Sequence, residues 1–292
     1  MAYSVTAGQN YVPLLDEIYK VSSKTAVLDG DNEMAREGAN PGELVVAKLA
    51  LQGQGAYSRT AGYVSGDVTL AWETVAADYD RGRMFAFDAV DNMDTFNTIL
   101  GNIAGEYIRT QVNPELDAYR IAKYAGTTGV GSATAALSTG AAAVAAIRVA
   151  LDTMDNAEVS EEDRYLFVTP GIKGMIDDLD TTKSRAVLER FADIIVVPQT
   201  RMYTVIDLYD GSTSGEEAGG YIKDTTNGGK NINFLAVAKS AVLQIPKHVA
   251  PKIITPEQNQ NADAYKFGYR FVGINKVLDN KKAGIYCHYS TS

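Results

Sequence analysis

The sequence predicts an α+β protein, and two observations support that fold class. Residues 44–75 and the last fifth of the chain show apolar and polar side chains in alternation, which is typical of strands. Residues 96–119 and 141–155 instead place apolar side chains three or four positions apart, which is typical of amphipathic helices. At 292 residues, the chain is long enough for one large or two modest domains with a sizeable core.

The composition is that of a soluble globular protein. Hydrophobic residues make up 46% of the chain and charged residues 22%, and no run of about 18 apolar residues predicts a membrane span. The single cysteine, Cys287, excludes an internal disulfide and suits a reducing compartment. The 36 acidic residues outnumber the 27 basic ones, which argues against tight DNA binding because such binding depends on Lys and Arg.

The first third of the chain predicts an arm followed by a long hairpin. Residues 1–43 show no sustained period and predict an extended arm with little core of its own. Strands are expected at 44–51 and 67–75, joined by the Gly-rich stretch 53–66. These two strands and their connection form an oversized β-hairpin.

A long amphipathic helix is expected after the hairpin. Its apolar positions run from Phe96 to Tyr119, and Asp91 or Asn92 is placed to cap its start. Pro114 lacks a backbone N–H and lies inside this pattern, so we expect a kink or a break near residues 110–113.

The second half predicts a mixture of strands and helices. Residues 126–140 are a linker of small residues, residues 141–155 a helix, and Pro170 the first position of another helix. Strands are expected at 165–168, 265–271 and 283–290, and the apolar run 194–198 predicts a strand in the middle of a sheet. In the 265–271 strand, the aromatic side chains share one face, and Lys266, Gly268 and Arg270 share the other.

The acidic stretch 78–94 is the first candidate for chemistry, because paired carboxylates can perform acid and base catalysis or hold a metal ion. Its five Asp residues are spread over strand ends and a helix start, where capping and the helix dipole also favour Asp. We therefore favour a structural role for these carboxylates over a catalytic one.

The sequence predicts no metal site. The segment Asp29–Glu33 resembles the start of a calcium loop, but Met34 and Asn40 occupy the positions where that loop needs Gly and Glu. Only His248 and His288 are present, without a His-Glu-x-x-His motif or a cysteine cluster. Both histidines are interpreted as surface or core side chains.

The sequence also predicts no catalytic residue and no cofactor. Cys287 and His288 are adjacent in an expected strand and therefore point to opposite faces, which prevents a local Cys/His dyad. No Gly-x-Ser-x-Gly motif is present, and the glycines of 126–140 match neither the dinucleotide nor the P-loop pattern. Trp72 and the aromatic stripe of 265–271 could form a stacking platform, but such a stripe is more often the core face of a sheet.

Two parts of the predicted architecture have little to pack against within one subunit. An arm without a core and a hairpin without a covering layer lose conformational entropy when they become ordered, and they bury too little surface in their own subunit to offset that loss. Both make sense if neighbouring copies of the chain supply the missing surface.

Four blocks of the sequence resemble the major capsid proteins of tailed double-stranded DNA bacteriophages. They are "DYDRGRMFAFDAVDNMDT" (78–95), "QVNPELDAYRIAKYA" (111–125), "IIVVPQTRMYT" (194–204) and "ADAYKFGYRFVGINKVLDNKKAGIYCH" (262–288). They occur in the family's order and cover the chain from about Leu44 onward, whereas the arm and the loops of 205–230 match poorly.

The resemblance implies the phage major capsid fold: an N-terminal arm (1–43), an extended loop (44–84), a peripheral domain with a long spine helix (85–131 and 247–292) and an axial α/β domain (132–246). The final strands are expected to return to the peripheral sheet. In this family the base of the extended loop lies over a neighbouring subunit. As hypothetical contacts between subunits we assign Trp72, Glu73, Asp78, Asp80, Arg81, Arg83, Glu115, Asp117 and Arg120.

The implied function is structural rather than enzymatic. Pentamers and hexamers of the chain would assemble in the cytoplasm of a bacterial host into the icosahedral head of the virion, with weak charge contacts allowing error correction. The head would enclose DNA without binding it tightly or sequence-specifically, because its wall is acidic. Expected partners are a separate scaffolding protein and a portal, with a decoration protein left open, and no membrane.

Two other functions remain as alternatives. An encapsulin-like nanocompartment shell has the same fold but encloses enzymes instead of DNA. A hydrolase would use two of the carboxylates near residues 73–94. Replacing Asp80, Arg81 and Arg83 by Ala separates a shell protein, which should lose assembly, from an enzyme, which should lose turnover.

Overall fold

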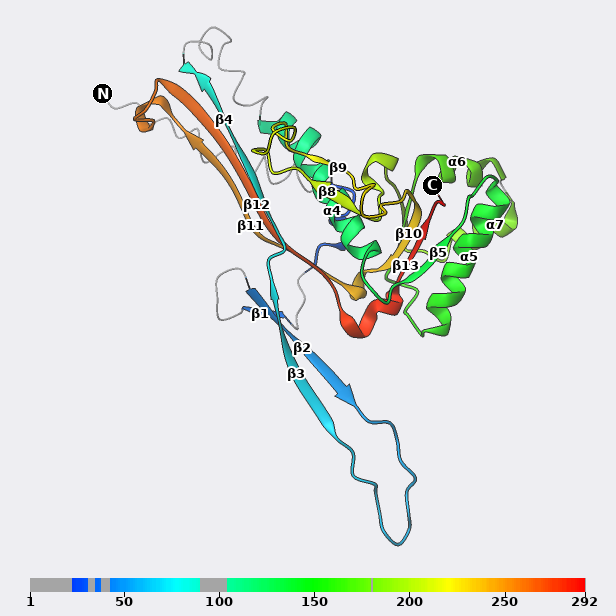
Figure 1. Cartoon of the computed structure of the whole chain (residues 1–292). Coiled ribbons are helices and arrows are strands. Elements are labelled where there is room, and N and C mark those ends of the chain that lie inside the picture. The colour runs from blue at the N-terminus through cyan, green and yellow to red at the C-terminus, as the bar shows by residue number, and fades with distance from the viewer. Residues whose placement is uncertain (1–22, 31–34, 38–42, 90–103, 180, 292) are drawn as a thin grey trace.

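A computed structural model describes residues 23–30, 35–37, 43–89, 104–179 and 181–291 (Figure 1). Most of the predicted arm and the predicted helix start, with the Asp91 or Asn92 cap, lie outside these residues. In the described chain, the strands are β1 (Ala35–Glu37), β2 (Glu43–Leu51), β3 (Val68–Ala76), β4 (Tyr79–Asp88), β5 (Gly131–Thr134), β6 (Arg164–Val168), β7 (Asp193–Val196), β8 (Ile206–Leu208), β9 (Tyr221–Lys223), β10 (Ile232–Ala238), β11 (Val242–Ile254), β12 (Ala264–Val277) and β13 (Ile285–Tyr289). The α-helices are α4 (Asn113–Ala125), α5 (Gly140–Asn156), α6 (Pro170–Leu179) and α7 (Thr182–Leu188).

One layer of the molecule is a three-stranded antiparallel sheet in the order β11-β12-β4, packed against the long helix. The aromatic stripe predicted on β12 is confirmed, because Phe267, Tyr269 and Phe271 are buried while Arg270, on the opposite face, is exposed. Ile108 and Leu116 from the long helix close this core, and both are fully buried. The alternating pattern of β12 therefore attaches the sheet to the helix.

The long helix passes through Pro114 without ending. The irregularity expected just before this proline takes the form of a π-helical turn at Ile108–Val112, followed directly by α4. In a π-helical turn, each backbone N–H bonds to the carbonyl five residues back instead of four. The altered bonding just before Pro114 lets the helix continue through this residue, which has no backbone N–H.

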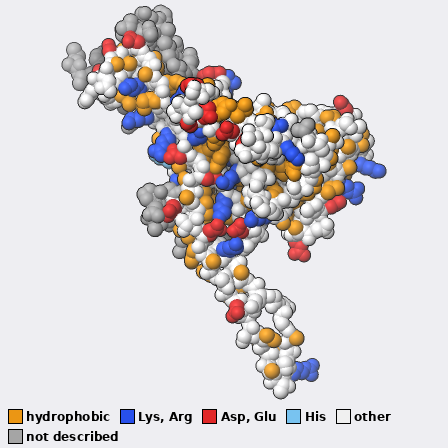
Figure 2. Space-filling model, viewed as in Figure 1, with side chains coloured by type: hydrophobic (Ala, Val, Ile, Leu, Met, Phe, Trp, Pro, Cys, Tyr) orange, Lys and Arg blue, Asp and Glu red, His pale blue; other side chains and the backbone are white. Residues whose placement is uncertain are grey.

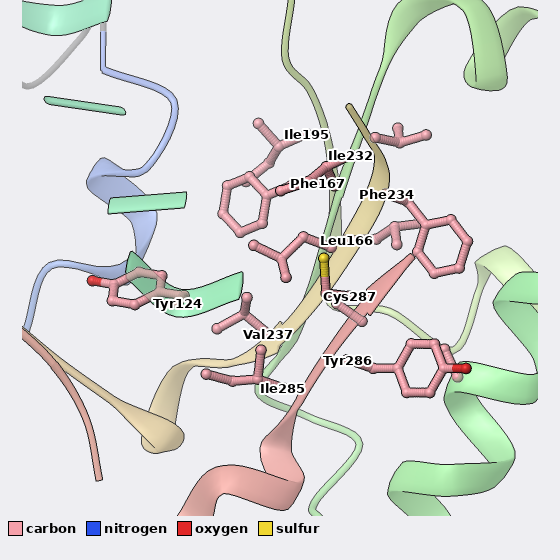
Figure 3. Packing of buried hydrophobic residues seen from close by; sticks show 14 of the residues in the cluster. Tyr124, Leu166, Phe167, Ile195, Ile232, Phe234, Val237, Ile285, Tyr286 and Cys287 are labelled. Atoms are coloured by element: carbon pink, nitrogen blue, oxygen red, sulfur yellow. The ribbon is translucent and has the colours of Figure 1, made fainter. Parts of the chain in front are cut away.

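A second layer is the five-stranded sheet β5-β13-β10-β6-β7, against which helices α5, α6 and α7 pack (Figure 1). Its core contains Phe167, Leu166 and Val168 from β6 and Phe234 from β10, all nearly or completely buried (Figure 3). The predicted strand at 165–168 and the helix start at Pro170 are confirmed. Strand β5 arises inside the stretch 126–140, which the sequence predicted to be only a linker.

Two strand placements differ from prediction. The strand at 194–198 was expected in the middle of a sheet, but among the described residues β7 lies at an edge and pairs with β6 alone. Within its apolar run, Ile195 and Val197 are buried, whereas Val196 is 38% exposed. The last strand was expected to return to the peripheral sheet, but β13 lies between β5 and β10. Its side chains Ile285 and Cys287 complete the core of the second layer.

The hairpin β2–β3 projects from the body of the molecule (Figure 1). Both predicted strands are confirmed, and their pairing extends from Glu43↔Ala76 to Leu51↔Val68. Only the base has a core, in which Leu44, Val46 and Val75 pack on Leu243 and Ile274 of the body. Among the described residues, no helix is long and apolar enough to cross a membrane.

Candidate functional site

The most unusual surface of the molecule is one face of the projecting hairpin. The register places Leu49 opposite Leu70, Leu51 opposite Val68, and Ala47 opposite Trp72. Residues two apart in a strand share a face, so these six side chains form one continuous apolar surface, which we call the hairpin apolar face. Its large members are half or more exposed: Leu49 51%, Leu51 66%, Val68 67%, Leu70 54% and Trp72 50%.

Among the described residues, the five large side chains of this face stay half or more exposed, and the hairpin that carries them projects from the body in Figure 2. An isolated two-stranded hairpin is at best marginally stable in water. Contiguous apolar patches on a soluble surface are typical of sites of protein association. The hairpin apolar face therefore has the composition and the geometry that are typical of a docking surface.

The tip of the hairpin is ordered by its own side chains. Tyr57 and Tyr63 pack with their ring centroids 4.9 Å apart. Ser58 and Gly62 exchange two backbone hydrogen bonds, and Gly62 has a φ of +81°, which a residue with a side chain rarely adopts. Tyr63 is 89% exposed.

Ion pairs orient the hairpin relative to the body. Glu73 pairs with Lys276 of β12, and Lys48 donates to Asp279 over 3.3 Å. Hydrogen bonds from Lys282 and then Lys48 hold the pKa of the Asp279 carboxyl below its usual value. Each exposed pair adds little energy by itself. Together with the small core at the base, they fix the angle at which the hairpin leaves the body.

The predicted contact residues on β4 make bonds within their own chain. Asp80 forms a two-pronged pair with Arg270, with N–O distances of 2.8 and 2.5 Å, and this hydrogen bonding lowers the pKa of Asp80. Asp78 accepts hydrogen bonds from Tyr119 and from the backbone N–H of Asn275, over 3.0 and 2.9 Å.

Arg81 and Arg83 bind the loop between β8 and β9. Arg83 donates to the carbonyls of Ala218 and Glu217 over 2.6 and 2.7 Å, and Arg81 donates to the carbonyl of Tyr209 over 2.7 Å. The two guanidinium groups therefore hold both ends of the loop 209–220 against β4. The sequence could not show this partner, because the loop follows β4 by more than 120 residues.

A groove of about 1280 Å³ lies between β4, the long helix and this loop. Tyr107, Tyr269 and Phe85 line it together with Arg81 and Glu115. In its wall, Tyr79 donates to Glu115 over 2.7 Å, and Arg81 pairs with the same carboxylate. Burial and the nearby Glu115 carboxylate raise the pKa of Tyr79 well above its usual value, so the phenol stays protonated as a donor.

Asp117 and Arg120 were predicted to contact a neighbouring subunit, and this prediction is wrong. Both side chains have no exposed surface. Asp117 accepts hydrogen bonds from Ser23, Lys24 and Thr25, and Arg120 donates to Asn275. Both side chains bond the N-terminal segment, and Arg120 also bonds Asn275 of β12, so they face inward. For Trp72, Glu73, Asp78, Asp80, Arg81, Arg83 and Glu115, contact between subunits stays a proposal.

Cys287 and His288 point to opposite faces of β13, as predicted. Cys287 lies in the core, and burial raises the pKa of its thiol to about 12. His288 stacks on Phe234 with ring centroids 5.1 Å apart, and burial lowers the pKa of its imidazole. Within the described residues, no three His, Cys, Asp or Glu side chains group as metal ligands would.

The two series that make up the hairpin apolar face both lie in strands expected from the sequence. Val68, Leu70 and Trp72 alternate along one strand, and Ala47, Leu49 and Leu51 alternate along its partner. Their two-residue spacing was a visible signal. The register that places the two series on one face was not visible, because it depends on how the strands pair.

No protein-family model matches the chain, and no curated protein matches it in sequence. Solved structures do match its fold. A virus-like particle from Pyrococcus furiosus matches with a TM-score of 0.58 and 11% identity, covering 94% of this chain and 96% of that one. The structure of Gordonia phage Cozz matches with a TM-score of 0.58 and 12% identity, covering 93% and 87%. The mature capsid of bacteriophage PhiM1 matches with a TM-score of 0.58 and 11% identity, covering 86% and 82%.

These likenesses define a class of α+β folds found in the subunits of closed protein shells. Other matching structures are the capsids of cyanophage P-SCSP1u and Staphylococcus phage Andhra. The chain has the phage major capsid fold, as its sequence blocks indicated.

Proposed function

We propose that the chain is the major capsid protein of a tailed bacteriophage, which assembles as pentamers and hexamers into an icosahedral head around double-stranded DNA. The observation that carries this proposal is the hairpin apolar face, whose five large side chains are each 50% exposed or more. A second copy of the chain is the natural cover, because the structures that share this fold include assembled capsids.

The geometry gives the body and the hairpin of the subunit different roles. The body carries two well-packed cores, so it can fold before it meets its partners. The hairpin has a core only at its base, so it gains most of its buried surface on association. Many weak contacts of this kind allow subunits to rearrange before the shell is complete.

The net charge of −9 suits a wall around packaged DNA. A negatively charged surface repels phosphates, so DNA could enter and leave without being bound tightly. A separate scaffolding protein and a portal complete the proposal, with assembly in the cytoplasm of the bacterial host and the mature protein in the virion.

An encapsulin-like shell is the second candidate, because the particle from Pyrococcus furiosus shares the fold over nearly its whole length. The four phage-like sequence blocks favour the phage head. The nucleic acid and protein content of purified particles separates the two, since a phage head contains DNA and a nanocompartment contains a cargo enzyme.

Negative-stain electron microscopy of the purified chain, alone and with its candidate scaffold, tests the proposal. Closed shells, tubes or sheets of hexamers are expected. As a matched control, residues 49–70 are replaced by Asn-Gly, which connects Lys48 to Ala71 by a two-residue turn and removes most of the apolar face. This variant should stay folded and dispersed. Dispersed wild-type protein in both preparations would contradict an assembling subunit.

A further inference from the structure

The N-terminal segment 23–30 runs beside α4 (Figure 1) and is held mainly by polar groups. Leu28 is its one large side chain that is fully buried. Ser23 and Thr25 are also buried, at 7% and 0% exposure, although both carry a hydroxyl group. Buried hydroxyl groups need partners, and the partners here come from distant parts of the chain.

Asp117 provides most of these partners. Its Oδ1 accepts from the Ser23 hydroxyl over 2.7 Å, from the Thr25 hydroxyl over 2.7 Å and from the Thr25 backbone N–H over 3.1 Å. Its Oδ2 accepts from the Lys24 backbone N–H over 2.9 Å and from Arg201 over 3.0 Å. A carboxylate has about four acceptor positions, so this group is saturated, and Arg201 balances its charge.

Arg120 and Gln244 bind the other side of the same segment. Arg120 donates to the Thr25 hydroxyl over 3.1 Å and pairs with Asp29 over 3.2 Å. Gln244 donates to the Thr25 carbonyl and to Asp29, each over 2.7 Å.

Other parts of the body orient these side chains before the segment arrives. Tyr124 donates to the Gln244 amide oxygen over 2.7 Å, and Asn275 accepts from Arg120 over 3.0 Å. The site is therefore assembled from α4, β11, β12 and the turn Gln199–Arg201. A site whose side chains are held in place binds with less loss of conformational entropy.

We infer that Asp117, Arg120 and Gln244 form a docking site, which we call the arm clasp, for residues 23–29 of their own chain. The clasp fixes residues 23–29 against the body of the subunit. A short connection further on, β1 pairs with β2 of the hairpin, so the clasp also ties the hairpin base to the long helix. The three side chains are thus positioning residues for assembly, a role that rests on the proposed function.

The clasp can open without unfolding the body. When residues 23–29 detach, Asp117 still accepts a hydrogen bond from Arg201, and Arg120 still donates one to Asn275. The two main cores of the body contain only Leu28 and part of Val27 from this segment. Opening therefore exposes less apolar surface than global unfolding, and the segment should exchange its amide hydrogens independently of the central strands.

Hydrogen exchange measured by mass spectrometry on the full chain tests the clasp, with Thr25→Val as the variant. Valine keeps the shape of threonine but removes the hydroxyl that bonds both Asp117 and Arg120. Lys24→Ala is the matched control, because the Lys24 side chain is exposed and only its backbone N–H contacts Asp117. Asp117→Asn provides the same test from the body side.

In Thr25→Val, exchange in residues 24–30 should rise about tenfold, the factor for about 1.4 kcal/mol, while β10 and β13 stay unchanged. Lys24→Ala should match the wild type. The inference is overturned if the wild-type amides of Lys24 and Thr25 exchange as fast as in a free peptide. It is also overturned if Thr25→Val raises exchange equally in the segment and in the central strands.

Assembly is a second and separate readout. Thr25→Val should give fewer or misshapen shells than Lys24→Ala at equal concentration. If the wild type forms no shells, the proposed function fails, but the exchange experiment still decides the clasp. If shells form equally well in both variants, Asp117, Arg120 and Gln244 are not positioning residues for assembly.

Discussion

Replacing Leu51 and Leu70 by threonine should weaken assembly without unfolding the subunit. Both side chains lie on the hairpin apolar face, at 66% and 54% exposure, and neither belongs to the core at the base of the hairpin. Threonine is β-branched, which suits a strand, but it removes much of the apolar surface of leucine. Because both sites are exposed, the free energy of unfolding should change by no more than about 0.5 kcal/mol.

The expected loss follows from the exposed fractions. Burying a whole leucine side chain is worth about 1.5 to 3 kcal/mol. Roughly half to two-thirds of each side chain remains to be buried by a neighbour, which leaves about 1 kcal/mol per site after the methyl group of threonine is counted. The double variant should therefore lose about 2 kcal/mol per subunit contact, or about 30-fold in the concentration at which shells form.

Light scattering over a dilution series measures that concentration, and urea unfolding of the dispersed subunit measures stability. The matched control is Ala50→Thr with Ala71→Thr, because both residues lie on the opposite face of the same hairpin. The control should assemble nearly as the wild type does. An onset of assembly within threefold of the wild type in the Leu51 and Leu70 variant would refute the argument, and so would an equal loss in the control.

Three further predictions concern the body. Glu158 follows α5 with a φ of 56°, a conformation that disfavours side chains, so Glu158→Gly should raise the free energy of unfolding by about 1 kcal/mol in a urea titration. A lower stability would contradict that strain. Burial lowers the pKa of His288 below that of the unfolded chain, so the unfolded state binds the extra proton, and stability should fall as the pH drops below about 6.5. In His288→Gln the acid-side slope should be shallower, by at most about 1.4 kcal/mol per pH unit; an unchanged slope would remove His288 as the cause. Arg83 holds two carbonyls of the loop 209–220, so in Arg83→Ala a Glu-specific protease should cut at Glu216 or Glu217 about tenfold faster, with Arg83→Lys in between. Equal cleavage rates in all three proteins would show that the loop is held by other contacts.

Local patterns in the sequence predicted much of the fold. The alternation in β2, β3 and β12 and the three- and four-residue spacing of the long helix are properties of neighbouring residues. These three strands, and the part of the long helix that the structure describes, formed where expected. Pro114 marked the helix irregularity for the same reason, because the missing N–H acts within one or two turns. The composition likewise limited the chemistry, since one cysteine and two histidines offer few catalytic or metal sites.

The charged residues show where local sequence patterns no longer predict the structure. The resemblance to phage capsid proteins led us to assign Asp80, Arg81, Asp117 and Arg120, from two of the phage-like blocks, as hypothetical contacts between subunits. The structure exposes Asp80 and buries Asp117 and Arg120 completely. The partners that bury them lie 92 to 155 residues away, in the N-terminal segment and in β12.

By itself, the sequence determined several of the strands and helices and which side of each is apolar, because those properties depend on residues a few positions apart. Only the tertiary structure decided that β13 joins the five-stranded sheet, that Asp117 clasps the N-terminal segment, and that two apolar series share one face of the hairpin. Pairing and burial of this kind depend on the register between distant segments, which no local pattern specifies.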